Sequence, residues 1–203
     1  MQLQKIPNQI IRSRLKPLNL AKVDNIVLHH MAHATADVKT VERWHVNGNG
    51  WDAIGYNYWV GFDGTVYEGR GLHIGAGVAN HNSHIVSIGF QGDYSKHDMM
   101  PDAQFNAGVE LIEYLMPFLP NCKSIKGHRD FGGSVCPGKY FPLEEIKKMK
   151  IRTKELTSVN DIIWELAHRG IITNKELWFD KLSNDENAYW LARKCVNYIR
   201  GQD

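Results

Sequence analysis

The pattern of apolar residues changes near residue 150, and this change constrains the fold more than any other feature of the sequence. Before that point, short apolar runs typical of buried strands alternate with segments of helical periodicity. After it, the stretch 158–203 shows helical periodicity alone. Interleaved strands and helices indicate an α/β domain. A tight Asp63-Gly64 turn between two strands adds a hairpin, so we expect a mixed central β-sheet flanked by helices.

Two domains are therefore predicted. Residues 1–150 form the α/β domain, residues 151–157 form a linker, and residues 158–203 form a small all-helical module. A module of this length has a marginal core by itself, although helical domains of this size occur. Within the first domain, residues 1–22 carry five basic side chains and no acidic one, and we expect them to be an irregular lead-in.

The overall composition excludes several classes of protein. Lys and Arg total 24 against 22 Asp and Glu, and a net charge of +2 is too weak for a nucleic-acid binder. No run approaches the roughly 20 apolar residues of a membrane-spanning helix, so no membrane insertion is expected. The basic start of the chain lacks the apolar centre of a secretory signal, which predicts synthesis in the cytoplasm. Three scattered cysteines do not form a disulfide framework.

The residues with the clearest chemical meaning lie at the ends of two predicted strands. The apolar run 25–30 leads to His29, and a later run ends at His128. Cys136 follows after a glycine-rich turn that can aim an imidazole and a thiolate at one point. Zn²⁺ binds His nitrogen and Cys sulfur in tetrahedral geometry, and His29 is the natural candidate for a third ligand. Three protein ligands leave one position for water, as in catalytic zinc sites.

Four motifs extend this pattern along the chain. They are LHHMA at 28–32, GYNYWVGFDGTVYEGR at 55–70, VSIGFQGDY at 86–94 and GHRDFGGSVCPG at 127–138. In this order they resemble the zinc-dependent N-acetylmuramoyl-L-alanine amidases, a family that includes phage lysozyme-type amidases and peptidoglycan recognition proteins. The resemblance covers about residues 23–142. It implies a zinc site in a surface groove and a hydrolase that cleaves the amide between N-acetylmuramic acid and L-alanine of the peptidoglycan stem peptide.

The resemblance also implies roles for individual residues. His29, His128 and Cys136 take the positions of the zinc ligands. Family members in which that cysteine is replaced tend to bind peptidoglycan without cutting it, so Cys136 favours an active enzyme. Asp130 is a candidate to accept a hydrogen bond from a ligand histidine and so fix its tautomer, with capping of the turn as the alternative.

Two catalytic candidates follow from the same resemblance, and the chain departs from the family around them. Tyr56 takes the place of the tyrosine beside the zinc-bound water, with a core aromatic as the alternative. Ser134 stands where relatives carry Lys, Thr or Arg to hold the developing oxyanion, with a plain turn serine as the alternative. Gln91 replaces a glutamate that acts as acid or base in some members. A loop histidine that contacts substrate is missing from its usual place, and His73 or His81 is a candidate substitute.

Two other functions stay open. The first is a peptidoglycan-recognition protein that binds without hydrolysis, which Ser134 and Gln91 leave possible. The second is a cysteine hydrolase in which Cys136 acts with His128 or His29 and no metal takes part.

The segment 158–203 resembles the short helical modules appended to phage endolysins of Gram-positive hosts. This resemblance implies cell-wall binding or a homodimer, with a helical extension that only covers the catalytic domain as the alternative. Trp164, Trp178 and Tyr189 are candidates for stacking on sugars if they are exposed, with a place in the helical core as the alternative. We therefore expect a phage or prophage endolysin that is made in the cytoplasm and acts on bacterial peptidoglycan after release.

Overall fold

The computed structural model describes most of the chain. The described residues are 2–97, 99–148 and 174–200, together with residues 159, 162, 163, 166, 171 and 172. The chain divides into two compact units, Met1–Lys150 and Ile151–Asp203. The predicted linker 151–157 lies outside the described residues. None of the helices in the described ranges has the length and apolar character needed to span a membrane.

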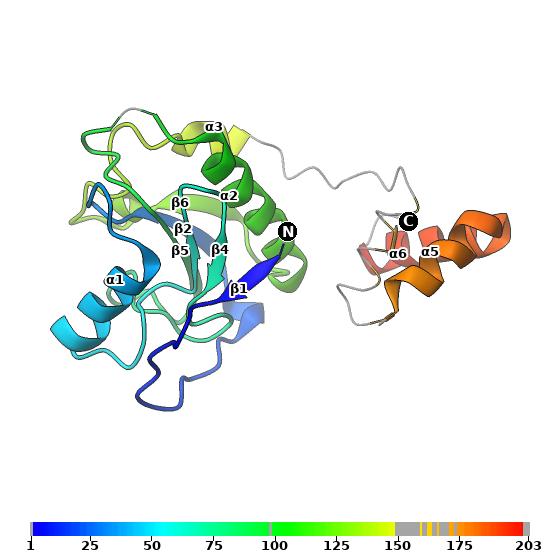
Figure 1. Cartoon of the computed structure of the whole chain (residues 1–203), viewed down its shortest axis with the longest axis horizontal. Coiled ribbons are helices and arrows are strands. Elements are labelled where there is room, and N and C mark those ends of the chain that lie inside the picture. The colour runs from blue at the N-terminus through cyan, green and yellow to red at the C-terminus, as the bar shows by residue number, and fades with distance from the viewer. Residues whose placement is uncertain are drawn as a thin grey trace. The chain divides into compact units, whose positions relative to one another are not determined.

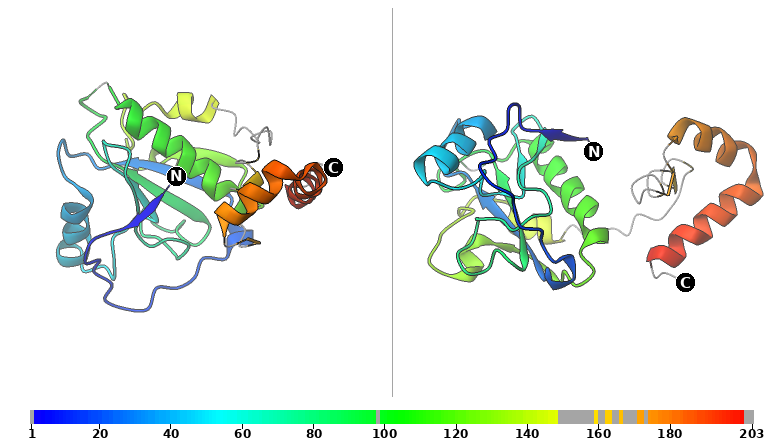
Figure 2. Two further views of the ribbon diagram at one scale, coloured as in Figure 1. Left: turned by 45° about the vertical axis from the view of Figure 1, so that its right-hand side comes forward. Right: turned by 90° about the horizontal axis from the view of Figure 1, so that it is seen from below.

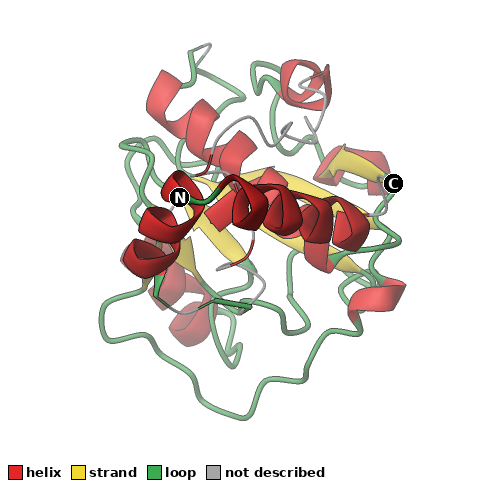
Figure 3. Ribbon diagram, turned by 90° about the vertical axis from the view of Figure 1, so that its right-hand side faces the viewer, coloured by secondary structure: helices red, strands yellow, loops and turns green. Residues whose placement is uncertain are grey.

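The first unit is built on a six-stranded sheet in the order β1-β4-β3-β5-β2-β6. Its strands, yellow in Figure 3, are β1 (Leu3–Lys5), β2 (Asn25–His30), β3 (Tyr58–Val60), β4 (Val66–Glu68), β5 (Ile85–Phe90) and β6 (Ser124–Gly127). Neighbouring strands are parallel except for β3 and β4, which form the antiparallel hairpin predicted at Asp63-Gly64. The mixed sheet confirms the predicted fold class.

Helices cover both faces of this sheet. The regular helices of the unit are α1 (Val38–Arg43), α2 (Asp102–Leu115) and α3 (Leu143–Lys148). In Figures 1 and 2, α1 lies on one side of the strands, and α2 and α3 lie on the other. The α2 side holds the larger core, in which Leu111 and Leu115 pack with strand residues such as Ile88. On the α1 side, Val38 and Val41 pack with Trp59.

The alternation of side chains along β2 decides where its two histidines point. Ile26 and Leu28 belong to the core on the α2 side. Successive side chains of a strand point to opposite faces, so His30 points to the same side as Ile26 and Leu28. There its Nδ1 accepts the Tyr94 N–H at 2.9 Å. His29 therefore points to the α1 face of the sheet.

The first residues of the chain correct one expectation. Residues 1–22 were expected to be irregular, but Leu3–Lys5 form the edge strand β1, parallel to β4. Ile6, only 2% exposed, then packs with Trp59 on the α1 side. A strand of three residues is too short to show an alternating pattern in the sequence. It is recognised from its pairing at the edge of the sheet and from the burial of Ile6 after it.

The second unit contains the helices α5 (Lys175–Asn184) and α6 (Glu186–Arg200). Most of the first predicted helical segment of this module, with Trp164, lies outside the described residues. A small apolar core contains the buried residues Ile162, Ile163, Leu166, Ile172, Leu182 and Val196. Trp178 and Tyr189 are partly buried against this core, while Trp190 is 48% exposed.

Candidate metal centre

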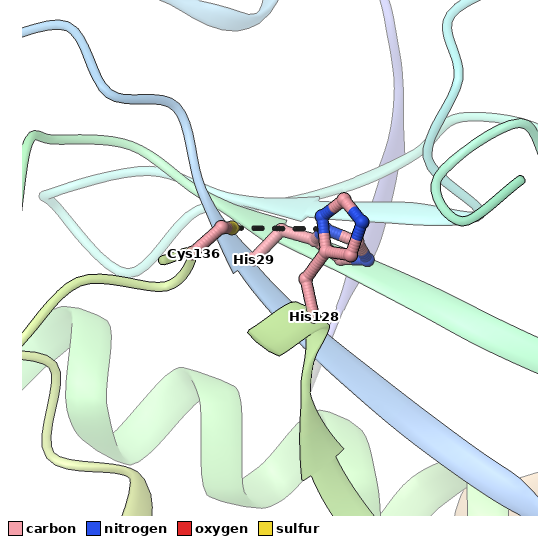
Figure 4. Close-up of side chains that lie close together, drawn as sticks. All are labelled: His29, His128 and Cys136. Carbon is pink, nitrogen blue, oxygen red and sulfur yellow. Dashed lines mark hydrogen bonds between the residues drawn. The ribbon is translucent and has the colours of Figure 1, made fainter. Parts of the chain in front are cut away.

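The three side chains predicted to bind zinc lie together at one edge of the sheet. His29 is the penultimate residue of β2, and His128 directly follows β6. Because β2 and β6 are parallel neighbours, their carboxyl ends lie side by side. Cys136 comes from the loop beyond β6, and Figure 4 shows its side chain directed at His29. One donor atom from each residue lies within 4.8 Å of the other two.

Hydrogen bonds to main-chain groups of Cys136 and its loop hold the residue in this position. The Arg129 N–H donates to the carbonyl oxygen of Cys136 at 2.7 Å, which closes the loop back onto the residue after His128. The Cys136 N–H donates to Ser134 Oγ at 3.1 Å. The guanidinium of Arg129 also donates to the Gly138 carbonyl at 3.1 Å. The loop is therefore built to present the Cys136 thiol, independently of any ligand.

The donor atoms of these residues fit a divalent cation that prefers nitrogen and sulfur. His29 Nδ1 lies 3.8 Å from Cys136 Sγ, while its Nε2 is buried and has no hydrogen-bond partner. Burial lowers the pKa of His29 to about 3, and it also lowers the pKa of His128, so both rings are neutral as ligation requires. Burial raises the pKa of the Cys136 thiol to about 11, and a bound cation would stabilise the thiolate instead. Two imidazoles and one thiolate match Zn²⁺.

Tyr56 lies beside this centre, on the same side of the sheet. Its ring centroid is 5.3 Å from that of His29. Burial raises the pKa of the Tyr56 phenol, so the hydroxyl stays protonated and is a hydrogen-bond donor. Gly89, the β5 partner of His29 in the sheet, gives the tyrosine room, since a Cβ there would lie 2.7 Å from the Tyr56 ring.

His45 is a neighbour of Tyr56 that the sequence does not single out. It lies in the helical turn Trp44–Gly48, and its ring centroid is 5.5 Å from that of Tyr56. Its Nδ1 accepts the Gly55 N–H at 3.0 Å, which fixes the remaining proton on Nε2. Burial, with the nearby charge of Arg70, lowers the pKa of His45 to about 4. The apolar spacing of its helix already accounts for a buried side chain, so only the fold reveals this contact.

The carboxylate of Asp130 makes the turn-capping contact that was the alternative to its role beside a ligand histidine. Its Oδ2 accepts the Gly127 N–H at 3.0 Å and lies 3.9 Å from Lys147 Nζ. This contact holds the end of β6 where His128 begins. A hydrogen bond from Asp130 to a ligand histidine stays a prediction.

The remaining candidates have structural partners. Gln91 accepts the Phe62 N–H at 3.1 Å through Oε1, so its amide holds the β3–β4 hairpin. His73 Nδ1 lies 2.8 Å from the Arg70 carbonyl oxygen. The His81 ring centroid is 4.8 Å from that of Phe131, in the short helical turn that begins at His128. His81 therefore lies close to the turn that begins at the ligand His128. His73 instead contacts a main-chain carbonyl of its own loop.

The fold and this centre together define a class of α/β proteins. This chain carries a His-His-Cys metal-binding group at the edge of a mixed sheet, and three protein donors would leave the fourth position of a tetrahedral zinc ion for water, as in catalytic zinc sites. The family model described as "N-acetylmuramoyl-L-alanine amidase" (Amidase_2) matches residues 19–139. The chain belongs to this family, and the zinc-ligand set His29, His128 and Cys136 is intact. The resemblance predicted from the four motifs is thereby confirmed at the level of the family.

Comparison with individual proteins gives the same result. The chain is 33% identical over 123 residues to peptidoglycan-recognition protein SC2 of Drosophila simulans, covering 55% of this chain and 66% of that protein. It is 31% identical over 149 residues to an N-acetylmuramoyl-L-alanine amidase of Sus scrofa, covering 63% of this chain and 23% of the pig protein. A solved structure, the endolysin amidase LysCS of Clostridium intestinale, superimposes with a TM-score of 0.65 at 26% identity, covering 72% of this chain and 93% of that one. The chain thus spans a small part of the pig relative and nearly all of the clostridial one.

Proposed function

We propose that this protein is a zinc-dependent amidase that cleaves the bond between N-acetylmuramic acid and the L-alanine of the peptidoglycan stem peptide. The observation that carries the proposal is the convergence of His29, His128 and Cys136 at the sheet edge. Membership of the amidase family and the similarity to amidases from a mammal and a bacterium support it.

The chain's own residues have distinct tasks in this reaction. When zinc is held by the two imidazoles and the thiolate, it activates water and polarises the scissile carbonyl. The protonated phenol of Tyr56 donates a hydrogen bond to the carbonyl oxygen as that oxygen gains charge. Ser134 accepts the Cys136 N–H through Oγ, which leaves its hydroxyl proton free to donate to the same oxygen.

Digestion of purified cell walls tests the activity. We expect new amino groups on L-alanine without new reducing sugars, and loss of this product when zinc is removed by a chelator. Reducing sugars without new amino groups would instead identify a glycosidase. Tight wall binding by zinc-loaded protein without any product would identify a recognition protein, and full activity without zinc would identify a cysteine hydrolase.

We further propose that the protein is a phage or prophage endolysin, made in the bacterial cytoplasm and active on the wall after release. The similarity to the clostridial endolysin amidase supports this role. Expression in a susceptible bacterium tests it: lysis should follow only when a second protein permeabilises the membrane. Lysis by the chain alone would contradict the role.

Residues 1–150 are proposed as the catalytic domain, and residues 158–203 as a module that binds the wall or pairs two copies of the chain. The division of the chain into two compact units supports this assignment. Removal of residues 151–203 should preserve hydrolysis of soluble wall fragments and reduce sedimentation with intact walls. Unchanged sedimentation would exclude wall binding by the module, and a change in solution from the mass of two chains to that of one after the deletion would indicate pairing.

A further inference from the structure

Two buried polar atoms of the described residues lack a hydrogen-bond partner, and they lie close to each other. They are Nε2 of His29 and Oγ of Ser87. In the parallel register of β2 and β5, His29 is opposite Gly89, so Ser87 is two residues away on the same face. Both atoms border Gly77, since a Cβ built there would lie 2.5 Å from Ser87 Oγ and 3.1 Å from His29 Nε2. Gly77 therefore packs directly against both atoms, which do not hydrogen-bond to each other in this structure.

The main chain of Ser87 and the side chain of the neighbouring Asn57 already have hydrogen-bond partners, which leaves the Ser87 hydroxyl unpaired. The Ser87 N–H donates to Asn57 Oδ1 at 2.9 Å, and the Asn57 N–H donates to the Ser87 carbonyl at 2.9 Å. The amide of Asn57 in turn donates to two loop carbonyls. The backbone of Ser87 is therefore fixed without any help from its hydroxyl. A buried hydroxyl without a partner destabilises the fold, so Ser87 needs another explanation.

Ligation of a metal supplies that explanation. The Nδ1 atom of His29 faces Cys136, so the ring proton must sit on Nε2 when Nδ1 binds a cation. The cation also withdraws charge from the ring, which makes Nε2–H a stronger donor. Metal-ligating histidines almost always donate this second N–H to an acceptor that orients the ring. In the part of the chain that the structure describes, Ser87 Oγ is the unsatisfied acceptor beside it.

We propose that Ser87 is a positioning residue of the metal centre: its hydroxyl accepts a hydrogen bond from His29 Nε2–H when Nδ1 binds the metal. This inference rests on the proposed zinc site. Ser87 holds the ring in the orientation that serves ligation and has no contact with the substrate. Gly77 is part of the arrangement, because a methyl group there would lie too close to both the hydroxyl and the ring.

The test compares Ser87→Ala with Ser87→Thr, which keeps a hydroxyl, and with Ser124→Ala as a matched control. Ser124 is also a strand serine, but its hydroxyl bonds to Asn25 away from the centre. Zinc affinity is measured by competition with a chelating dye, and the unfolding midpoint is measured with and without zinc. Proton NMR of the zinc-loaded protein follows the exchange of His29 Nε2–H with water.

We expect Ser87→Ala to bind zinc about 10- to 100-fold more weakly and to exchange the Nε2 proton faster, while Ser87→Thr and Ser124→Ala retain the wild-type affinity. Without zinc, Ser87→Ala should be at least as stable as the wild type, because it removes an unpaired hydroxyl. A purely structural serine would lower stability equally with and without zinc. Gly77→Ala should weaken zinc binding as Ser87→Ala does.

Wild-type zinc affinity and a protected Nε2 proton in Ser87→Ala would overturn the inference while leaving the amidase proposal intact. Failure of the wild-type protein to bind one zinc ion would instead refute the proposed function itself.

Discussion

Replacement of Asn57 by alanine should strongly destabilise the first unit. The side chain of Asn57 is fully buried and satisfies three main-chain groups. Its Oδ1 accepts the Ser87 N–H at 2.9 Å, and its Nδ2 donates to the carbonyls of Gly71 and His73, each at 2.7 Å. A buried group that loses its partner costs about 1–3 kcal/mol, and the His73 contact is only partly buried. We therefore expect a loss of about 3–5 kcal/mol in the free energy of unfolding, a large part of the ~5–15 kcal/mol typical of a domain.

Urea unfolding of the zinc-free protein measures this loss. Asn121→Ala is the matched control, because the Asn121 amide also donates to a main-chain carbonyl, but at an exposed position. That control should change stability by less than about 0.5 kcal/mol. If Asn57→Ala lost less than about 1 kcal/mol, water or rearranged loops would be satisfying the three groups, and the reasoning would be refuted.

Asn57→Asp sharpens the same test through its pH dependence. The new carboxylate keeps the acceptor for Ser87 but faces two carbonyl oxygens where the amide donated. Repulsion favours the protonated acid in the folded state, so its pKa is raised above the unfolded value. The folded state then binds more protons than the unfolded state, and stability falls as the pH rises through this window. If the free energy of unfolding of Asn57→Asp did not change with pH where the new acid titrates, the side chain of residue 57 would not face the two carbonyl oxygens.

Further predictions concern the metal centre and its neighbours. Tyr56→Phe should lower the release of amino groups from walls about 10²- to 10³-fold and leave zinc affinity unchanged, whereas equal losses of both would point to a structural role. Cys136→Ser should abolish both zinc binding and turnover, and turnover without zinc would exclude the proposed chemistry. The pKa of His45 is lowered to about 4 from an ordinary 6.5, so the unfolded state takes up a proton first as the pH falls. Zinc-free protein should therefore lose stability between about pH 6.5 and 4, and His45→Gln should lose less across that window, as urea unfolding at several pH values would show. Chelation should lower the thermal midpoint of the zinc-loaded protein, since a ligand bound to the folded state stabilises it; an unchanged midpoint would mean that no metal was bound.

The parts of the fold that the sequence predicts are those with strong local patterns. The apolar run ending at His29 and His30 reads directly as a buried strand, and the structure places β2 there. Residues 102–116 show clear helical spacing, and α2 covers Asp102–Leu115. His128 at a strand end and Cys136 after a glycine-rich turn indicate a metal site from the sequence, and the resemblance of the four motifs to the amidase family supports the full set of ligands.

Contacts that depend on the register of the sheet could not be predicted in the same way. Ser87 lies inside the run VSIGF, which reads as an ordinary core strand. Its approach to His29 depends on the parallel pairing of β2 with β5, and on a glycine at residue 77 from a separate loop. Asn57 likewise reads as one polar residue between aromatic neighbours, although its side chain joins β5 to the loop that carries Gly71 and His73. The contacts of such polar side chains can be identified only in the folded structure, where distant segments of the chain meet.

The long separation of the metal ligands along the chain has a consequence for when the metal centre can form during synthesis. His29 and Cys136 are 107 residues apart, and the outermost strand β6 delivers the chain to both His128 and Cys136. A ribosome-bound chain that stops short of these residues can already contain β2 and most of its neighbours, yet it has at most one of the three donors. The three donors therefore come together only after the edge strand β6 and the loop that follows it have joined the sheet, whereas the other five strands are neighbours of one another without β6.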